Sequence, residues 1–360
     1  MTDQASTHAS LSQAVGTYYS KKIIKDFEPK TAFYAAAPIK EEMPVGGGNV
    51  VNFLRYRKIA ALYSDNTNQF TAQQMYESAA QLTATLHERH GYVQISRFTS
   101  LVARNNALDQ IAGRVAKAAA KTADKLVRND LGFCVADKAT YSAGMFDNLA
   151  IDGGSLNSSG ITARIWTERS DGFPMYHNKT RLAQSGTVVS IAGSAMTIKT
   201  LQAGVSVLEG NDADVLADGN YRFICHPDVT FQITTEAGFK GWISPTSQDG
   251  ARKRPSEVGI VAGVMVENTT LGYKFPLSGD TLSTGSGNLY GSLLFGDQAY
   301  GVANVAGEQG ADGFEFFLKQ SGTQSTNDPA NLIKQAAFRV TGVGRVINKS
   351  GGLWIVTTKV

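Results

Sequence analysis

The sequence predicts an α+β protein in which strands are laid on one long helix. Apolar positions in residues 105–131 recur every three or four residues, the period of a helix with one buried stripe. The chain also has 37 glycines against nine prolines and many Thr, Ser, Asn and Val residues, a composition typical of abundant strands and turns. With 42% hydrophobic residues, the 360-residue chain can bury a substantial core in one large or two ordinary domains.

The helix at 105–131 is the element that we expect to organise the chain. Asp109 lies in its first turn, Lys125 and Arg128 lie near its last, and Gly132 follows where a left-handed residue would end it. A helix of this length spans about 40 Å. Four alanines keep its middle thin, so strands or another subunit can approach closely. The alternative is an ordinary core helix of a large domain.

Residues 1–47 are expected to form an arm rather than a domain. Scattered apolar anchors cannot build a core alone, so we expect this segment to become ordered by lying across another surface. Its lysines would then face solvent or phosphate. The anchors are Tyr18, Ile23, Ile24, Phe27, Phe33 and Tyr34, and the lysines are Lys21, Lys22, Lys25 and Lys30.

Two strands are expected to hold up a projecting loop after the arm. Val51 and Phe53 alternate with Asn52 and Leu54, a pattern that predicts a strand. A similar pattern in residues 87–98 predicts the second strand. Residues 64–82, between them, have too few large apolar side chains for a core. Because an isolated two-stranded ribbon is marginal in water, we expect it to pack on a neighbouring molecule.

The rest of the chain is strand-rich. We expect Pro227 to end a buried strand and Asp228 to cap the helix that follows. The predicted elements are strands in ITARIWT and GTVVSIAG, a helix at 194–208, a strand at 221–225, a short helix from about Val229 and a core strand through Val264 and Val266.

No pattern of catalytic residues stands out. His226 and Asp228 would need a nucleophile in a recognisable turn, and the chain has no G-x-S-x-G element. The glycine-rich stretches GGGNVV, GSGNLYG and TGVGRV lack the helix and lysine of a phosphate cradle, so we interpret them as turns. We therefore predict that the protein is not an enzyme and binds no cofactor, and that its function lies in its surfaces.

Metal and redox sites are not predicted either. His87 and His90 stand three apart beside Glu88, but no third ligand is in sight. Cys134 and Cys225 lack metal-ligand spacing and are expected to be buried thiols in a reducing compartment. The basic run 252–254 is interpreted as a solvated loop, with an intersubunit contact as the alternative.

Net charge and hydropathy indicate which classes of partner the protein is expected to lack. A formal net charge of +3 gives no support for a dedicated nucleic-acid reader. The N-terminus lacks the features of a secretion signal, and no segment has eighteen successive apolar residues. We expect a protein that is made in a cytoplasm, that has no membrane partner and that stays soluble or assembles there.

The order of these parts resembles the major capsid proteins of tailed bacteriophages with the Hong Kong 97-like fold, most closely the N-four-like coat-protein family. The resemblance covers the whole chain in order, with 135–193 matching least. In the family an acidic-x-Gly segment leads into a strand, a place that Glu257, Val258 and Gly259 fit. The segments that carry the resemblance are GGGNVVNFLRYR, GYVQIS, the long helix, DGNYRFICHPD with SEVGIVAGVMVENTT, and KQAAFRVTGVGRVINKSGGLWIVTTKV.

The resemblance implies a discontinuous domain organisation. The expected parts are an N-terminal arm at 1–47, an extended loop at 48–96, a peripheral domain at 97–217 with the spine helix 105–131 and a candidate strand-rich insertion at 135–193, an apical domain at 218–333, and return strands to the peripheral domain at 334–360.

It also implies a function and partners. Many copies would form hexamers and pentamers of an icosahedral head around double-stranded DNA, so the protein would be found in the virion after assembly in the host cytoplasm. A separate scaffold, a portal and decoration or cement proteins are the expected partners, and contact with DNA would be non-specific. The alternative is a strand-rich tail or fibre protein that binds a host surface. Apolar loop contacts with a neighbour are predicted at Phe53, Tyr56, Phe70 and Tyr76.

Overall fold

The structure is a computed structural model in which the following residues are described: 31–44, 47–56, 78–96, 107–132, 134–137, 164–167, 171–177, 179–181, 195–236, 242–243, 256–276, 288–305, 314–319 and 333–358. The helices among them are α3 (Ala107–Leu131), α4 (Ile198–Gly210), α5 (Pro227–Thr235) and the short 3₁₀ turn η3 (Lys349–Gly351). The strands are β1 (Ile39–Met43), β2 (Val50–Tyr56), β3 (Ala79–Thr85), β4 (His87–Ser96), β5 (Cys134–Asp137), β6 (Arg164–Thr167), β7 (Met175–His177), β8 (Thr180–Arg181), β9 (Tyr221–Cys225), β10 (Trp242–Ile243), β11 (Glu257–Val261), β12 (Val264–Asn268), β13 (Tyr273–Pro276), β14 (Asn288–Phe295), β15 (Tyr300–Val305), β16 (Phe314–Lys319), β17 (Ile333–Val346) and β18 (Gly352–Thr358).

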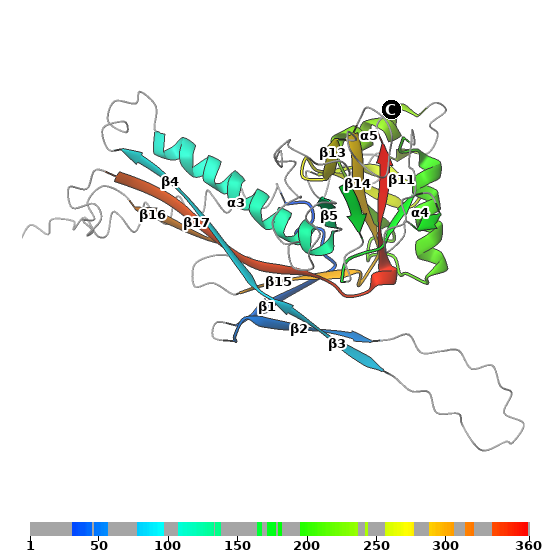
Figure 1. Ribbon diagram of the computed structural model, residues 1–360, viewed down its shortest axis with the longest axis horizontal. Coiled ribbons are helices and arrows are strands. Elements are labelled where there is room, and N and C mark those ends of the chain that lie inside the picture. The colour runs from blue at the N-terminus through cyan, green and yellow to red at the C-terminus, as the bar shows by residue number, and fades with distance from the viewer. Residues whose placement is uncertain are drawn as a thin grey trace, which may run out of the picture.

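The long helix α3 lies along a five-stranded sheet, as the sequence predicts (Figure 1). In this sheet β1, β15, β17 and β16 are neighbours, and β4 pairs with β17 from Ile333 opposite Ser96 to Gly342 opposite His87. Small side chains allow the close approach, because alanines of α3 pack directly on aromatic and β-branched residues of the sheet. This contact consists of Ala116, Ala119, Ala120, Ala123, Phe314 and Val340.

A nine-stranded sheet lies beside the C-terminal end of α3, and its central strands are buried on both faces (Figure 1). Along β18, Trp354 and Val356 face one core cluster, whereas Leu353 and Ile355 face the other, the alternation expected of a strand covered on both sides. Helices α4 and α5 cover the second face. That cluster joins Leu201, Leu208, Val229 and Ile233 of the helices to Phe223, Cys225, Val264, Val266, Tyr290 and Leu294 of the sheet.

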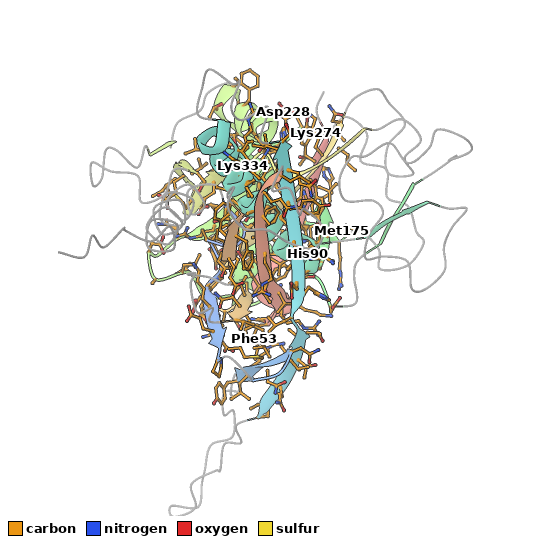
Figure 2. The ribbon with its side chains drawn as sticks, turned by 90° about the vertical axis from the view of Figure 1, so that its left-hand side faces the viewer. Phe53, His90, Met175, Asp228, Lys274 and Lys334 are labelled. Carbon is orange, nitrogen blue, oxygen red and sulfur yellow. The ribbon has the colours of Figure 1, made fainter. Side chains whose placement is uncertain are left out.

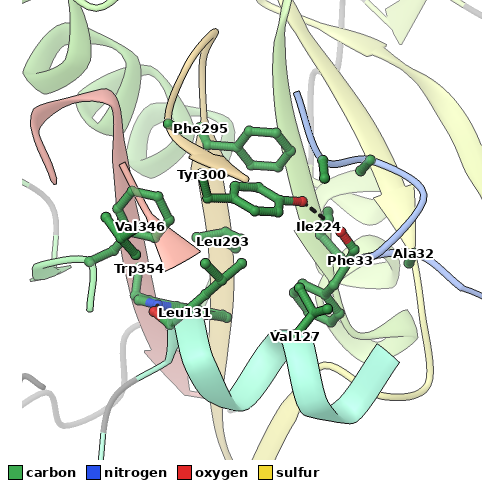
Figure 3. Packing of buried hydrophobic residues seen from close by; sticks show 14 of the residues in the cluster. Ala32, Phe33, Val127, Leu131, Ile224, Leu293, Phe295, Tyr300, Val346 and Trp354 are labelled. Carbon is green, nitrogen blue, oxygen red and sulfur yellow. Dashed lines mark hydrogen bonds between the residues drawn. The ribbon is translucent and has the colours of Figure 1, made fainter. Parts of the chain in front are cut away.

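The other core cluster joins the end of α3 to the N-terminal segment (Figure 3). Phe33 is fully buried in it, 6.2 Å from the ring of Trp354, and its carbonyl accepts a hydrogen bond of 2.7 Å from the Tyr300 hydroxyl. The sequence pattern predicts that the arm becomes ordered on another surface. For residues 31–43 that surface belongs to the same chain, since β1 also runs parallel to β15. The earlier anchors and lysines lie outside the described residues.

The predicted ribbon has a different second strand. β2 pairs with β3, from Val50 opposite Thr85 to Tyr56 opposite Ala79, whereas the expected partner at 87–98 forms β4 and pairs with β17. The stretch 64–82 was interpreted as a loop because it lacks large apolar residues. Residues 79–82 of this stretch instead begin β3, in which Leu82 is partly buried against the cluster that contains Phe53 and Ala84.

The predicted helix 105–131 and the strands 221–225 and 264–266 are confirmed as α3, β9 and β12. Residues 105 and 106 lie outside the described chain. Gly132 follows α3, but its φ is not positive. Glycine is required at position 132 for another reason, because a Cβ atom there would lie 1.8 Å from the Tyr273 hydroxyl oxygen. The expected left-handed end of the helix is therefore wrong.

The helix ends near the second sheet also differ in detail. The predicted helix 194–208 begins at Ile198, because the Thr197 hydroxyl caps it by accepting from the Thr200 N–H at 3.1 Å. In α5 the cap is His226, whose Nδ1 accepts from the backbone N–H of Asp228 at 3.2 Å. Pro227 begins this helix, a position where its missing N–H costs nothing. Asp228 is thus not the cap that the sequence suggested.

Candidate assembly surfaces

The β2–β3 ribbon presents one buried and one exposed face. Val51 and Phe53 point inward and pack with Ala303, Val343 and Ile347. On the opposite face the side chains of Leu54 and Tyr56 are 53% and 60% exposed. The ribbon is therefore anchored on its own subunit by one row, and a second apolar row is largely exposed among the described residues.

The structure shows which of the four predicted loop contacts are exposed. Phe53 is 1% exposed and lies at the root of the ribbon, so its prediction as an intersubunit contact is wrong (Figure 2). Alternation along a strand separates the two rows, and only tertiary packing decides which row is covered. Tyr56 lies on the exposed row, and Phe70 and Tyr76 lie outside the described residues. Leu54 lies on the same exposed row, although the sequence pattern did not predict it as a contact.

A second exposed apolar row crosses the five-stranded sheet on the side away from α3. Phe317 of β16 lies opposite Ala337 of β17, which lies opposite Tyr92 of β4, so the three side chains share one face. Tyr92 is 66% exposed and Phe317 51%. The next row pairs Arg339 with Glu315, and the Arg339 guanidinium lies 5.6 Å from the centre of the Phe317 ring. An aromatic row bordered by an ion pair is a surface suited to protein contact.

The His226 and Asp228 pair belongs to a polar cluster at the start of α5. Asp228 Oδ2 accepts from the Tyr290 hydroxyl at 2.5 Å and from Lys274 Nζ at 2.9 Å, which lowers the pKa of Asp228 to about 2 (Figure 2). Burial and the same hydrogen bond raise the pKa of Tyr290. Every one of these groups is engaged in positioning α5 on the sheet, and no nucleophile lies among them.

A buried ion network surrounds Arg222 in β9. Its guanidinium contacts Glu267 Oε1 at 2.5 Å and Asp218 Oδ2 at 2.8 Å, and Glu257 Oε1 lies 3.9 Å away. Glu257, the acidic residue of the acidic-x-Gly segment, is 1% exposed. Its role is therefore in the interior of the nine-stranded sheet, since buried carboxylates need such a partner.

The candidate metal and thiol residues do not come together in a site. His87 and His90 are three residues apart on β4, so their side chains point to opposite faces of the strand. In the described part of the chain, no group of three or more His, Cys, Asp or Glu is placed to hold a metal ion. Cys225 is a buried free thiol whose pKa is raised to about 12 by burial. The side chains of Cys134 and of the basic run 252–254 are not described.

Two of the glycine-rich stretches contribute residues to strands instead of turns. TGVGRV lies inside β17, and the second half of GSGNLYG begins β14. In GGGNVV, Gly48 has φ of +93°, a turn conformation. Among the described helices, none is both long and apolar enough to span a membrane.

Comparison with solved structures finds chains of phage heads. The chain superposes on one from the capsid of Ralstonia phage GP4 with a TM-score of 0.61, 11% identity and 92% of both chains covered. It superposes on one from the head of Helicobacter pylori bacteriophage KHP40 with a TM-score of 0.52, 8% identity, and 92% and 91% of the two chains covered. For the capsid of Helicobacter pylori bacteriophage KHP30 the values are 0.51, 8%, 93% and 90%. No family model matches the chain, and neither does any curated protein.

The chain therefore has the fold of these phage capsid chains, the Hong Kong 97-like fold that the resemblance implied. At identities near 10%, this agreement is one of topology rather than of individual residues.

Proposed function

We propose that this chain is the major capsid protein of a tailed bacteriophage, which self-assembles into the hexamers and pentamers of an icosahedral head around double-stranded DNA. The observation that carries the proposal is the structural match to a chain from a phage capsid, which covers 92% of each chain. Closed symmetry multiplies modest contacts into a stable shell.

The two exposed apolar rows are our candidates for contacts between copies. One row carries Leu54 and Tyr56 on the ribbon, and the other carries Tyr92 and Phe317 on the sheet. Aromatic and aliphatic side chains that protrude from a rigid sheet lose little entropy when a partner covers them, so they are effective anchors.

Packing within the subunit favours an amended domain division. We retain an arm at 1–47, an extended loop at 48–96, and a peripheral domain formed by α3 and the five-stranded sheet. We assign α4 and β18 to the apical domain with residues 218–333, because both lie in the core cluster of Phe223 and Leu294. The return segment 334–360 then divides after β17.

The finer expectations remain part of the proposal. They are membership of the N-four-like coat-protein family, a structural role without catalysis, assembly in the host cytoplasm, a separate scaffold, and portal and decoration or cement proteins as partners. The alternative, a tail or fibre protein, has no comparable support, because the matched chains form capsids and heads.

Negative-stain electron microscopy and sedimentation of the purified chain test the proposal. We expect closed shells, or rings of five and six copies, directly or on co-expression with the other head proteins. Elongated trimers, or a monomer under all of these conditions, would contradict it.

A pair of matched variants tests the ribbon surface. Leu54→Asp places a charge on the exposed apolar row, whereas Val215→Asp introduces the same charge at a 44% exposed valine outside the ribbon. We expect both variants to fold, Leu54→Asp to lose shells and Val215→Asp to keep them. Normal shells from Leu54→Asp would refute the assignment of this row.

A further inference from the structure

A buried carboxylate on α3 binds the N-terminal segment. Asp124 is fully buried, and its Oδ1 accepts a hydrogen bond of 3.0 Å from the backbone N–H of Tyr34. The backbone N–H groups of Ala32 and Phe33 also stabilise this carboxylate. All three belong to a turn in which the Ala36 N–H donates to the Ala32 carbonyl at 3.0 Å. A single side chain of α3 thus supplies the acceptor for consecutive N–H groups of this turn, which cannot be left unpaired in a protein interior.

The rest of the segment is held by apolar packing and by one sheet edge. We call residues 31–43 the N-terminal strap. Phe33 lies in the core cluster, and its carbonyl accepts from the Tyr300 hydroxyl of β15. In the described sheet, β1 is an edge strand that pairs with β15 alone. The strap can therefore leave the body of the subunit without breaking the pairing of any other described strands.

Asp124 is only partly compensated in this contact. Its Oδ2 is buried and has no hydrogen-bond partner among the described residues. A charged carboxylate needs partners for both oxygens when it is buried, whereas a protonated one carries a hydroxyl on one oxygen and still accepts with the other. Burial accordingly raises the pKa of Asp124 from 3.8 to about 6. Docking of the strap and binding of a proton to Asp124 are thus linked.

Few other charges act on Asp124. Arg128, one turn further along α3, lowers the pKa of Asp124, and its guanidinium also lies 4.6 Å from the centre of the Tyr273 ring of β13. Within residues 31–37, Tyr34 is the one titratable group. The first charge of the strap is Lys40, whose Nζ lies 5.5 Å from the centre of the Tyr34 ring. One cation therefore acts on the buried acid, and it is shared with an aromatic ring.

We propose that Asp124 is a proton-operated latch: its protonated form holds the N-terminal strap on α3, and loss of the proton raises the fraction of subunits in which the strap is detached. Because residues 32–34 lie directly on the carboxylate, detachment returns Asp124 to water, where the charged form is favoured. The strap follows residues 1–30 and precedes the β2–β3 ribbon, so the latch controls the point at which the arm leaves the subunit. This switch acts within one subunit and goes beyond the proposed assembly, so it can be tested without shells.

The direction and size of the effect follow from the two states of Asp124. Its pKa is about 6 when the strap is docked and 3.8, the ordinary value, when the strap is detached. Docking is therefore strongest below pH 3.8, weakens by up to about tenfold per pH unit as the pH rises to 6, and is nearly constant above that. The whole change is at most about 150-fold, and the part between pH 4 and 8 is at most about 60-fold.

Hydrogen–deuterium exchange of the purified full-length chain, measured by mass spectrometry between pH 4 and 8, tests the latch. Protection is expressed relative to the unfolded chain at each pH, which removes the intrinsic effect of pH on exchange. The test variant is Asp124→Asn, which keeps an acceptor for the Tyr34 N–H but cannot lose a proton. The control is Asp130→Asn, the same change on α3, where Oδ2 accepts from the Gly344 N–H of β17 at 2.9 Å. Amides of β9 report the opening of the whole subunit.

We expect the strap to be less protected than β9 at every pH, because it opens by itself. In wild type its protection should fall by up to about 60-fold from pH 4 to 8, with most of the change below pH 6. Asp124→Asn should show no such fall, and Asp130→Asn should retain it.

Three results would overturn the latch. They are a pH dependence in Asp124→Asn equal to that of wild type, strap protection equal to that of β9 at every pH, and strap protection in wild type that is constant or rises with pH. The last two need no variant, so they decide the question even if circular dichroism shows that Asp124→Asn does not fold. Failure of the chain to form shells would instead contradict the proposed function and leave the latch unaffected.

Discussion

Asp124 provides a pH-dependent test of how the N-terminal segment is held on α3. Its side chain is fully buried, and Oδ1 accepts from the backbone N–H of Tyr34 at 3.0 Å. Burial raises its pKa from 3.8 to about 6, although the backbone N–H groups of residues 32–34 and the Arg128 charge act in the opposite direction. At neutral pH the folded subunit therefore holds a buried carboxylate whose desolvation is only partly offset.

The magnitude follows from proton linkage. In the unfolded chain the carboxyl titrates near 3.8, and in the folded chain near 6. Between these values the folded state binds a proton that the unfolded state does not, so stability from this group is fully present below pH 3.8 and is lost as pH rises through 6. At about 1.4 kcal/mol per pKa unit, the full change is at most about 3 kcal/mol.

The assay compares wild type with Asp124→Asn by denaturant unfolding at intervals between pH 4 and 8. Asn keeps an acceptor for the Tyr34 N–H but cannot titrate, so the difference between the two unfolding free energies isolates this one group. We expect wild type to gain relative to the variant by up to about 3 kcal/mol as pH falls from 8 to 4, mostly between pH 6 and 4. A difference that stays constant over this range would refute the reasoning.

Two further predictions concern packing. Phe53→Ala should lower the free energy of unfolding of the subunit by about 3–5 kcal/mol, because it empties a filled contact between ribbon and body. Tyr56→Ala should change the free energy of unfolding by less than about 0.5 kcal/mol but reduce the yield of shells. Denaturant unfolding measures both variants. If Phe53→Ala and Tyr56→Ala destabilise the subunit equally, the ribbon does not have one buried and one exposed face. Gly132→Ala should cost about 2–4 kcal/mol, because the new methyl displaces the buried Tyr273. The double variant with Tyr273→Phe should recover part of this loss, and an additive loss would contradict the clash.

Local pattern was enough to predict several elements of this protein. The apolar period of residues 105–131 predicted α3, and the alternation around Val51 and Phe53 predicted β2 and separated its two faces. The buried strand 221–225 could be predicted because four of its five residues are hydrophobic and Pro227 follows it. Each of these patterns involves only residues that are close together in the sequence.

The assembly surfaces could be predicted only in part. Alternation cannot say which face of β2 the body of the subunit covers, so Phe53 was mistaken for an outward contact and Leu54 was missed. The Tyr92, Ala337 and Phe317 row could not be found at all, because it exists only when three strands distant in sequence pair in one register.

The sequence by itself determined the long helix, the strand-rich composition and the absence of recognisable catalytic motifs, because these depend on residue type and short spacing. Tertiary structure decided that β4 pairs with β17 rather than β2, that Phe33 belongs to its own subunit's core, and that Gly132 is required by Tyr273. The physical reason is that pairing, burial and close approach depend on contacts between residues far apart in the chain, whose register no local pattern contains.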